Sequence, residues 1–117
     1  MNPETLRANA LAYLDAYARK DLDSVAALLA EDVVLRDWTL RVVGKAAALA
    51  ETRKNFEAVQ SLAIEVLHWH QSEAAVAAEL RILIDGKQEL FVTDVIAFDA
   101  KGRIAAIRAY VGRGDSA

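Results

Sequence analysis

The chain has 117 residues, a net charge of −3 and a hydrophobic fraction of 55%. This is the length of a domain of about 100–150 residues, so we expect residues 1–117 to form a single domain. The absence of cysteine excludes disulfides, thiolate metal sites and cysteine nucleophiles. The negative charge argues against nucleic acid as the main partner, since phosphate binding needs a basic face.

The residues up to about position 60 have the patterns of helices and short strands. Asn2 suits a helix cap and Pro3 the first helical turn, and Asp21 or Asp23 can cap a second helix. The expected elements are helices over 3–19, 24–30 and 45–59 and strands over 33–37 and 41–44. No apolar run approaches the ~20 residues of a membrane span. The first residues lack the features of a signal peptide, so we expect a cytoplasmic protein that does not bind membranes.

From position 62 onward the pattern has a period of two. Four strands are expected over 62–71, 75–84, 89–98 and 103–111. Their connections have hairpin lengths, and two of them contain a glycine where a positive φ is expected. Helices followed by hairpin-linked strands favour an α+β fold, in which a mostly antiparallel sheet packs on three N-terminal helices.

One carboxylate interrupts the strand face that should pack on the helices. Asp94 shares this face with Val92, Ile96 and Phe98. An ionised carboxylate in an apolar site is costly, so such a group tends to stay protonated, and it could then donate a hydrogen bond to a developing oxyanion. The alternatives are that Asp94 pairs with an arginine or that a bulge turns it outward.

Two further polar residues occupy notable positions. Asp37 ends the strand over 33–37 beside Trp38, where a modestly raised pKa would suit a general base; the alternative is a solvated aspartate that opens a turn. Tyr13 lies on the inner stripe of the first helix. Its hydroxyl needs a partner, which either a substrate oxygen or the backbone could provide.

His68 and His70 share one strand face and could both reach a metal ion. No third ligand of obvious spacing accompanies them, so we expect histidines at the surface or at a dimer interface and no metal site. A phosphate-binding glycine loop, a serine-nucleophile elbow and an HExxH motif are all absent from the sequence.

Several short segments share the spacing of one known family: YLDAY at 13–17, KDLD at 20–23, the run over 26–32, Gly44, and FDAKGRI at 98–104. They resemble the opening helices, third-helix start and last hairpin of the ketosteroid isomerase branch of the nuclear transport factor 2-like superfamily. The SnoaL-like polyketide cyclases belong to the same superfamily. The resemblance covers nearly the whole chain and implies a cone-shaped α+β fold with a strongly curved sheet.

The resemblance also implies roles for three residues. Tyr13 matches the family's oxyanion-hole tyrosine, Asp94 its protonated oxyanion-hole aspartate and Asp37 its general base. The implied activity is a cofactor-independent isomerase or cyclase that moves a proton next to a carbonyl of an apolar small molecule, through an enolate. The residues expected to contact the substrate are Trp38, Phe56, Ala78, Leu80, Ile82, Ile96, Ile107, Ala109 and Val111.

Three other functions stay open. The pocket could bind an apolar molecule without catalysis, or the outer sheet face could make the chain an interaction module, as in the transport factor itself. An epoxide hydrolase like the limonene enzyme would need an Asp-Arg-Asp cluster, for which Arg53 could provide the arginine. We also expect a homodimer through the outer sheet face. The large apolar residues assigned to that face are Trp69, Phe91, Val95 and Tyr110.

Overall fold

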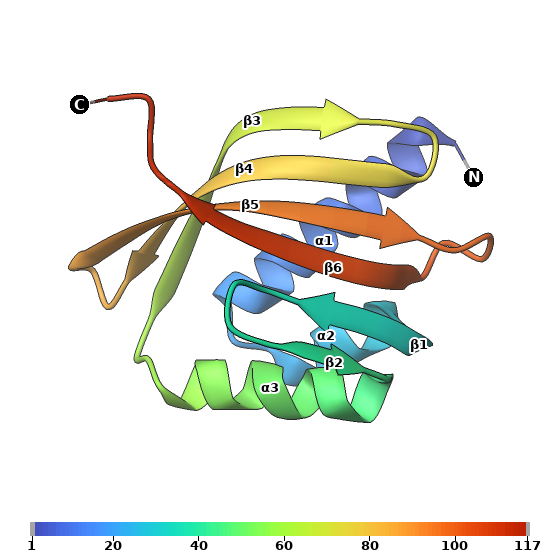
Figure 1. Cartoon of the computed structure of the whole chain (residues 1–117), viewed down its shortest axis with the longest axis horizontal. Coiled ribbons are helices and arrows are strands. Elements are labelled where there is room, and N and C mark those ends of the chain that lie inside the picture. The colour runs from blue at the N-terminus through green and yellow to red at the C-terminus, as the bar shows by residue number, and fades with distance from the viewer. Residues whose placement is uncertain (1, 117) are drawn as a thin grey trace.

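The computed structural model describes residues 2–116, and in this range the chain forms three helices and six strands (Figure 1). The helices are α1 (Pro3–Ala18), α2 (Leu22–Leu28) and α3 (Lys45–Glu57). The strands are β1 (Leu29–Arg36), β2 (Arg41–Val43), β3 (Leu62–Gln71), β4 (Ala75–Ile84), β5 (Gln88–Phe98) and β6 (Ile104–Gly112). The predicted α+β fold is confirmed. None of these helices is both long enough and apolar enough to span a bilayer.

Side-chain caps fix where the first two helices begin. The Asn2 side chain accepts a hydrogen bond of 2.8 Å from the Thr5 amide, and Pro3 occupies the first turn of α1. The Asp21 carboxylate accepts from the Ser24 amide, so α2 begins at Leu22. The second helix thus begins two residues before its predicted range of 24–30. It also ends two residues earlier, because β1 begins directly after it at Leu29.

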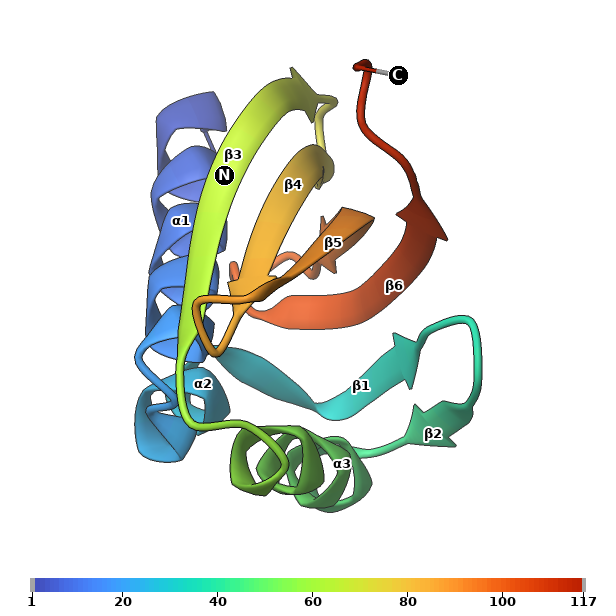
Figure 2. The ribbon, with the colours of Figure 1, turned by 90° about the vertical axis from the view of Figure 1, so that its left-hand side faces the viewer.

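The strands form one sheet in the order β2-β1-β6-β5-β4-β3. Neighbouring strands are antiparallel, except that β1 and β6 are parallel. The sheet curves strongly, with α1 behind β3 to β6 and α3 beside β1 and β2 (Figures 1 and 2). The buried core lies between the concave face of this sheet and α1.

The register of β4, β5 and β6 leaves open space on the concave face. Asp94 has Ala78 and Ala109 as its cross-strand neighbours. Ala109 lines the open space, which a larger side chain would fill, whereas Ala78 is completely buried. The apolar residues around this row, such as Leu80 and Val92, are buried as predicted.

The prediction that Trp69 lies on the outer face is wrong. A bulge between Val66 and His68 inserts one extra residue into β3, which inverts the alternation of faces beyond it. Trp69 therefore pairs with Ala78 on the concave face, where the Arg7 guanidinium lies 5.0 Å from the centre of its ring.

Of the other residues assigned to the outer face, Phe91 is covered by the C-terminal segment. A Cβ atom placed on Gly114 would lie 2.8 Å from the Phe91 ring. Val95 is half-buried, and Tyr110 remains 47% exposed. The exposed apolar part of this face is therefore smaller than predicted.

Candidate active site

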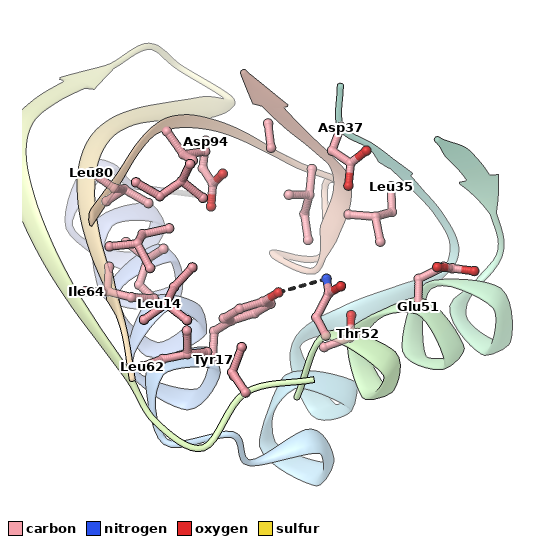
Figure 3. Close-up of a pocket in the computed structure, with 18 of the residues that line it drawn as sticks. Leu14, Tyr17, Leu35, Asp37, Glu51, Thr52, Leu62, Ile64, Leu80 and Asp94 are labelled. Atoms are coloured by element: carbon pink, nitrogen blue, oxygen red, sulfur yellow. Dashed lines mark hydrogen bonds between the residues drawn. The ribbon is translucent and has the colours of Figure 1, made fainter. Parts of the chain in front are cut away.

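A cavity of about 360 Å³ lies between the concave face of the sheet, α1 and α3 (Figure 3). Pockets for small molecules usually have volumes of about 300–1,000 Å³, so this one suits a compact ligand. Most of its lining is aliphatic: Leu14, Leu35, Leu40, Leu62, Ile64, Leu80, Ile82, Ile84, Leu90, Val92 and Ile107 are among the residues that form it. The polar side chains at the cavity are Tyr13, Tyr17, Asp37, Thr39, Glu51, Thr52, Asn55 and Asp94.

Asp94 points from the middle of β5 into this cavity (Figure 3). Within residues 2–116 its carboxyl group has no hydrogen bond and no ion pair, and its pairing with Ala78 and Ala109 shows no bulge. Burial alone raises the pKa of Asp94 to about 7. The alternatives of an arginine partner and of an outward-turned side chain are therefore wrong.

Tyr13 is buried on α1, on the other side of the cavity from the sheet. Burial raises its pKa well above the ordinary value, and the nearby Asp94 carboxyl and the Tyr17 phenol raise it further. Among the described residues, no hydrogen bond contributes to its pKa, so the backbone-bonded alternative does not apply. Tyr13 is a neutral phenol whose proton is free for a ligand.

Asp37 follows β1 directly and its side chain forms a turn with the next residues. Oδ1 accepts hydrogen bonds from the Thr39 amide at 2.8 Å, the Thr39 hydroxyl at 2.9 Å and the Leu40 amide at 2.9 Å. Partial burial raises the pKa of Asp37, but these hydrogen bonds outweigh it and lower the pKa below the ordinary value. The predicted raised pKa is therefore wrong. Since all three donors contact Oδ1, none of them occupies Oδ2.

The cavity thus holds two carboxyl groups in different protonation states. Asp94, with a pKa of about 7, carries its proton for part of the time at neutral pH. Asp37 is ionised there, because its pKa is lowered. Such a difference between two carboxyl groups in one site suits one of them to donate a proton and the other to accept one.

Five of the nine residues predicted to contact substrate line the cavity: Trp38, Leu80, Ile82, Ile107 and Ala109. The other four, Phe56, Ala78, Ile96 and Val111, do not.

The four exceptions have simple causes. Ala78 and Ile96 are completely buried in the core cluster that includes α1. Phe56 packs edge-on against Tyr17, with 4.9 Å between the ring centres. Val111 lies near the end of β6 and is 46% exposed.

The sequence interpretation missed Tyr17 and Asn55. Tyr17 follows Tyr13 by one helical turn, and this spacing places both on one face of α1. Asn55 lies on α3, where its Nδ2 donates a hydrogen bond of 3.1 Å to the Tyr17 hydroxyl. Thr52 faces inward on α3, whereas Arg53 is exposed and does not line the cavity. The hypothesis that Arg53 completes an Asp-Arg-Asp cluster is therefore wrong.

The two histidines lie on the outer side of the sheet, away from the cavity. His68 is 3.4 Å from an Asp115 carboxylate oxygen, and His70 is 2.7 Å from one of Glu79. Over residues 2–116, no three histidine or carboxylate side chains gather in a way that could hold a metal ion.

Comparison with known proteins identifies the family. The model of the SnoaL-like domain matches residues 10–107, and the chain therefore belongs to the SnoaL-like family. This confirms the family resemblance inferred from the sequence. No curated protein sequence matches the chain.

Solved structures share the fold across nearly the whole chain. A candidate SnoaL-like polyketide cyclase from Shewanella denitrificans OS-217 is 17% identical, with a TM-score of 0.83, over 95% of this chain and 92% of its own. A candidate ketosteroid isomerase from Kribbella flavida DSM 17836 is 21% identical, with a TM-score of 0.82, over 97% and 82%. An LEH-like epoxide hydrolase from M. tuberculosis is 25% identical, with a TM-score of 0.75, over 93% and 83%. Proteins that share this fold thus carry names of different activities: an isomerase, an epoxide hydrolase and a cyclase.

Proposed function

We propose that this protein is a cofactor-independent isomerase or cyclase that moves a proton next to a carbonyl group of an apolar small molecule. One observation carries the proposal. Asp37, Asp94 and Tyr13 line a single cavity, and the pKa values of the two carboxyl groups are shifted in opposite directions. A base and two neutral donors are the groups that formation of an enolate requires.

In the proposed reaction the carbonyl oxygen of the substrate accepts hydrogen bonds from Tyr13 and from protonated Asp94. Oδ2 of Asp37 removes a proton from the neighbouring carbon. The electrons of that C–H bond form a C=C bond, and the carbonyl oxygen becomes an oxyanion that both donors stabilise. Asp37 then returns the proton to a different carbon, which completes an isomerisation. In a cyclisation, the enolate carbon instead attacks a second carbonyl carbon of the same molecule; the π bond of that carbonyl breaks, and its oxygen takes the proton from Asp37.

The apolar walls support this chemistry. Leu80, Ile82 and Ile107 line the same cavity as the carboxyl groups, and hydrogen bonds to a developing charge are stronger where water is excluded. Trp38, which is 50% exposed, lines the cavity just after Asp37 and offers a flat apolar surface to a ligand.

The direct test follows conjugated-enone absorbance over a panel of small and steroidal β,γ-unsaturated ketones. We expect Asp37→Asn to abolish turnover while leaving ligand binding nearly intact, because the amide keeps the shape but cannot take the proton. Tyr13→Phe should lower kcat by about 10²–10³-fold, the usual loss for one oxyanion donor. Asp94→Asn should cost less, since the amide still donates one hydrogen bond. Turnover by Asp37→Asn at the wild-type rate would exclude the proposed base.

The alternative is a protein that binds an apolar molecule without catalysis. The lowered pKa of Asp37 favours this alternative, because a weaker base removes a carbon-bound proton less readily. A wild-type protein that binds ketones of the panel but converts none of them would leave binding as the function.

A further inference from the structure

The Tyr17–Asn55 pair forms a polar point on the helical wall of the cavity that the proposed reaction does not use. Tyr17 extends from α1 into the cavity, and the dashed line in Figure 3 marks its hydrogen bond of 3.1 Å with Asn55 of α3. The Tyr17 ring is fixed between Phe56, 4.9 Å from it between ring centres, and Tyr13, at 6.0 Å. Its hydroxyl is therefore held in a defined position.

The hydrogen bonds of this pair leave groups available to a ligand. Because Asn55 donates through Nδ2, the Tyr17 hydroxyl acts as the acceptor and keeps its own proton. The Asn55 Oδ1 atom is an acceptor. An accepted hydrogen bond polarises a hydroxyl and makes it a better donor. Together the two side chains offer one donor and one acceptor, which is the complement of a ligand hydroxyl group.

Two other polar groups on the α3 wall are already engaged. The Thr52 hydroxyl donates to the Ala48 carbonyl at 2.8 Å, and the Glu51 carboxylate accepts from Lys54 at 3.0 Å. Within the described residues, Tyr17 of α1, which meets this wall through Asn55, thus keeps a hydroxyl proton that no other side chain or backbone group takes.

The pair is separate from the predicted oxyanion hole. Burial raises the pKa of Tyr17, the Asn55 hydrogen bond lowers it, and the carboxyl groups of Asp94 and then Asp37 raise it. Tyr17 lies one helical turn beyond Tyr13, with 6.0 Å between the two ring centres, and Asn55 is an exposed residue of α3 that also lines the cavity.

We propose that Tyr17 and Asn55 form a second oxygen-recognition point, so that the ligand is a carbonyl compound with a second oxygen function, a hydroxyl or another carbonyl. The part of this inference that concerns the first carbonyl rests on the proposed function. The second point does not, because it requires binding alone. An apolar molecule with a single oxygen would leave the Tyr17 proton and the Asn55 oxygen without a ligand partner.

Fluorescence titration with naphthols tests the second point without any turnover. The probes are 2-naphthol, which has one oxygen, and 1,6-, 2,6- and 2,7-dihydroxynaphthalene, which have two at different separations. We expect at least one dihydroxy isomer to bind the wild-type protein about fivefold or more tightly than 2-naphthol, the typical gain from one hydrogen bond. Tyr17→Phe should remove this preference and leave the affinity for 2-naphthol unchanged.

The matched control is Tyr110→Phe, which removes the same hydroxyl from the outer face, where Tyr110 accepts from Arg36. It should keep the preference. Asn55→Leu is a second variant of the pair and should reduce the preference as well. Two results would overturn the inference: no dihydroxy isomer binds better than 2-naphthol, or Tyr17→Phe weakens both probe types equally, which would place Tyr17 at the first oxygen. If the preference is found but no ketone is converted, the proposed reaction fails while the recognition point stands.

Discussion

Asp37 and Asp94 show how the surroundings of a side chain determine its chemistry. Both line the same cavity, yet three hydrogen bonds stabilise the charge of Asp37, while the Asp94 carboxyl receives none in residues 2–116. Backbone amides that point at a carboxylate favour ionisation, and hydrocarbon around a carboxyl group opposes it. The same residue type is therefore ionised at one position and partly protonated at the other at neutral pH.

Asp94 should make the stability of the protein depend on pH. Its pKa is about 7 in the folded chain and near 3.8 in the unfolded chain, so the folded chain holds the proton more tightly. The resulting stabilisation is full below the unfolded pKa and is lost as pH rises to the folded pKa, at about 1 kcal/mol per pH unit.

Urea denaturation of the wild type and Asp94→Asn between pH 5 and 8 measures this effect. The difference in unfolding free energy should change by about 2 kcal/mol between pH 5 and 7 and level off above. Asp37 has the opposite shift and titrates below this window, so it does not interfere. Parallel curves for the two proteins would show that Asp94 is ionised in the folded state.

At the scale of the elements, the type of each helix and strand could be predicted. For β3 and α3, however, the sequence did not show which residues face the core. In β3 the bulge after Val66 reverses the faces, and the sequence His68-Trp69-His70 suits either arrangement. In α3 the run of alanines after Lys45 gives little periodic signal, and the hypothesis of an Asp-Arg-Asp cluster needs Arg53 on the buried face that Thr52 occupies. A pattern fixes the faces only where large apolar and polar residues alternate clearly.

The connection between α3 and β3 is held by side chains from elsewhere in the chain. The Asp85 carboxylate accepts hydrogen bonds from the Gln60 amide at 2.7 Å and the Ser61 amide at 3.0 Å. The Lys20 ammonium donates to the Val59 carbonyl at 2.6 Å. Since Val59 lines the cavity, these contacts position part of its wall.

Asp85→Ala should loosen this connection. The Gln60 and Ser61 amides would lose their acceptor, and alanine would be strained at the positive φ of 55° that Asp85 adopts. We expect faster hydrogen exchange at these two amides and a lower melting temperature, measured by NMR and calorimetry. Asp85→Asn keeps both the acceptor and the tolerance of positive φ, so it should behave like the wild type; equal exchange in all three proteins would contradict this account.

At the scale of the whole molecule, the curvature of the sheet decides which concave residues reach the cavity. Ala78 and Leu80 lie two residues apart on the same face of β4, yet only Leu80 lines the cavity. A helix that is distant in sequence covers part of this face and leaves the rest open to the cavity. The pattern of the strand alone therefore cannot predict which of its residues line the cavity. Tyr13, Asp37 and Asp94 could be selected because each interrupts or ends an apolar element. Asn55 could not, because it lies on an exposed part of α3.

The outer face of the sheet has an uneven charge distribution that suits pairing with a second copy. Arg41, Arg36 and Arg108 are cross-strand neighbours in one row over β2, β1 and β6. Three glutamates lie toward the opposite end of the sheet, where Arg81 pairs with Glu65 and Glu89 and His70 pairs with Glu79. A two-fold axis along the strands would place the basic end of each copy over the acidic end of the other. Such complementarity favours a symmetric dimer.

We therefore predict a homodimer through this face, centred on Val95 and Tyr110. Trp69 is not part of this interface, because it lies on the concave face. Light scattering at micromolar concentration should give twice the chain mass of 12.8 kDa. Val95→Glu should shift the protein toward monomer, because forming the dimer would remove the added carboxylate from water at the centre of the interface. The control Leu11→Glu, at an exposed position on α1, should remain dimeric. A monomeric wild type would exclude the dimer, and a dimeric Val95→Glu variant would place its interface elsewhere.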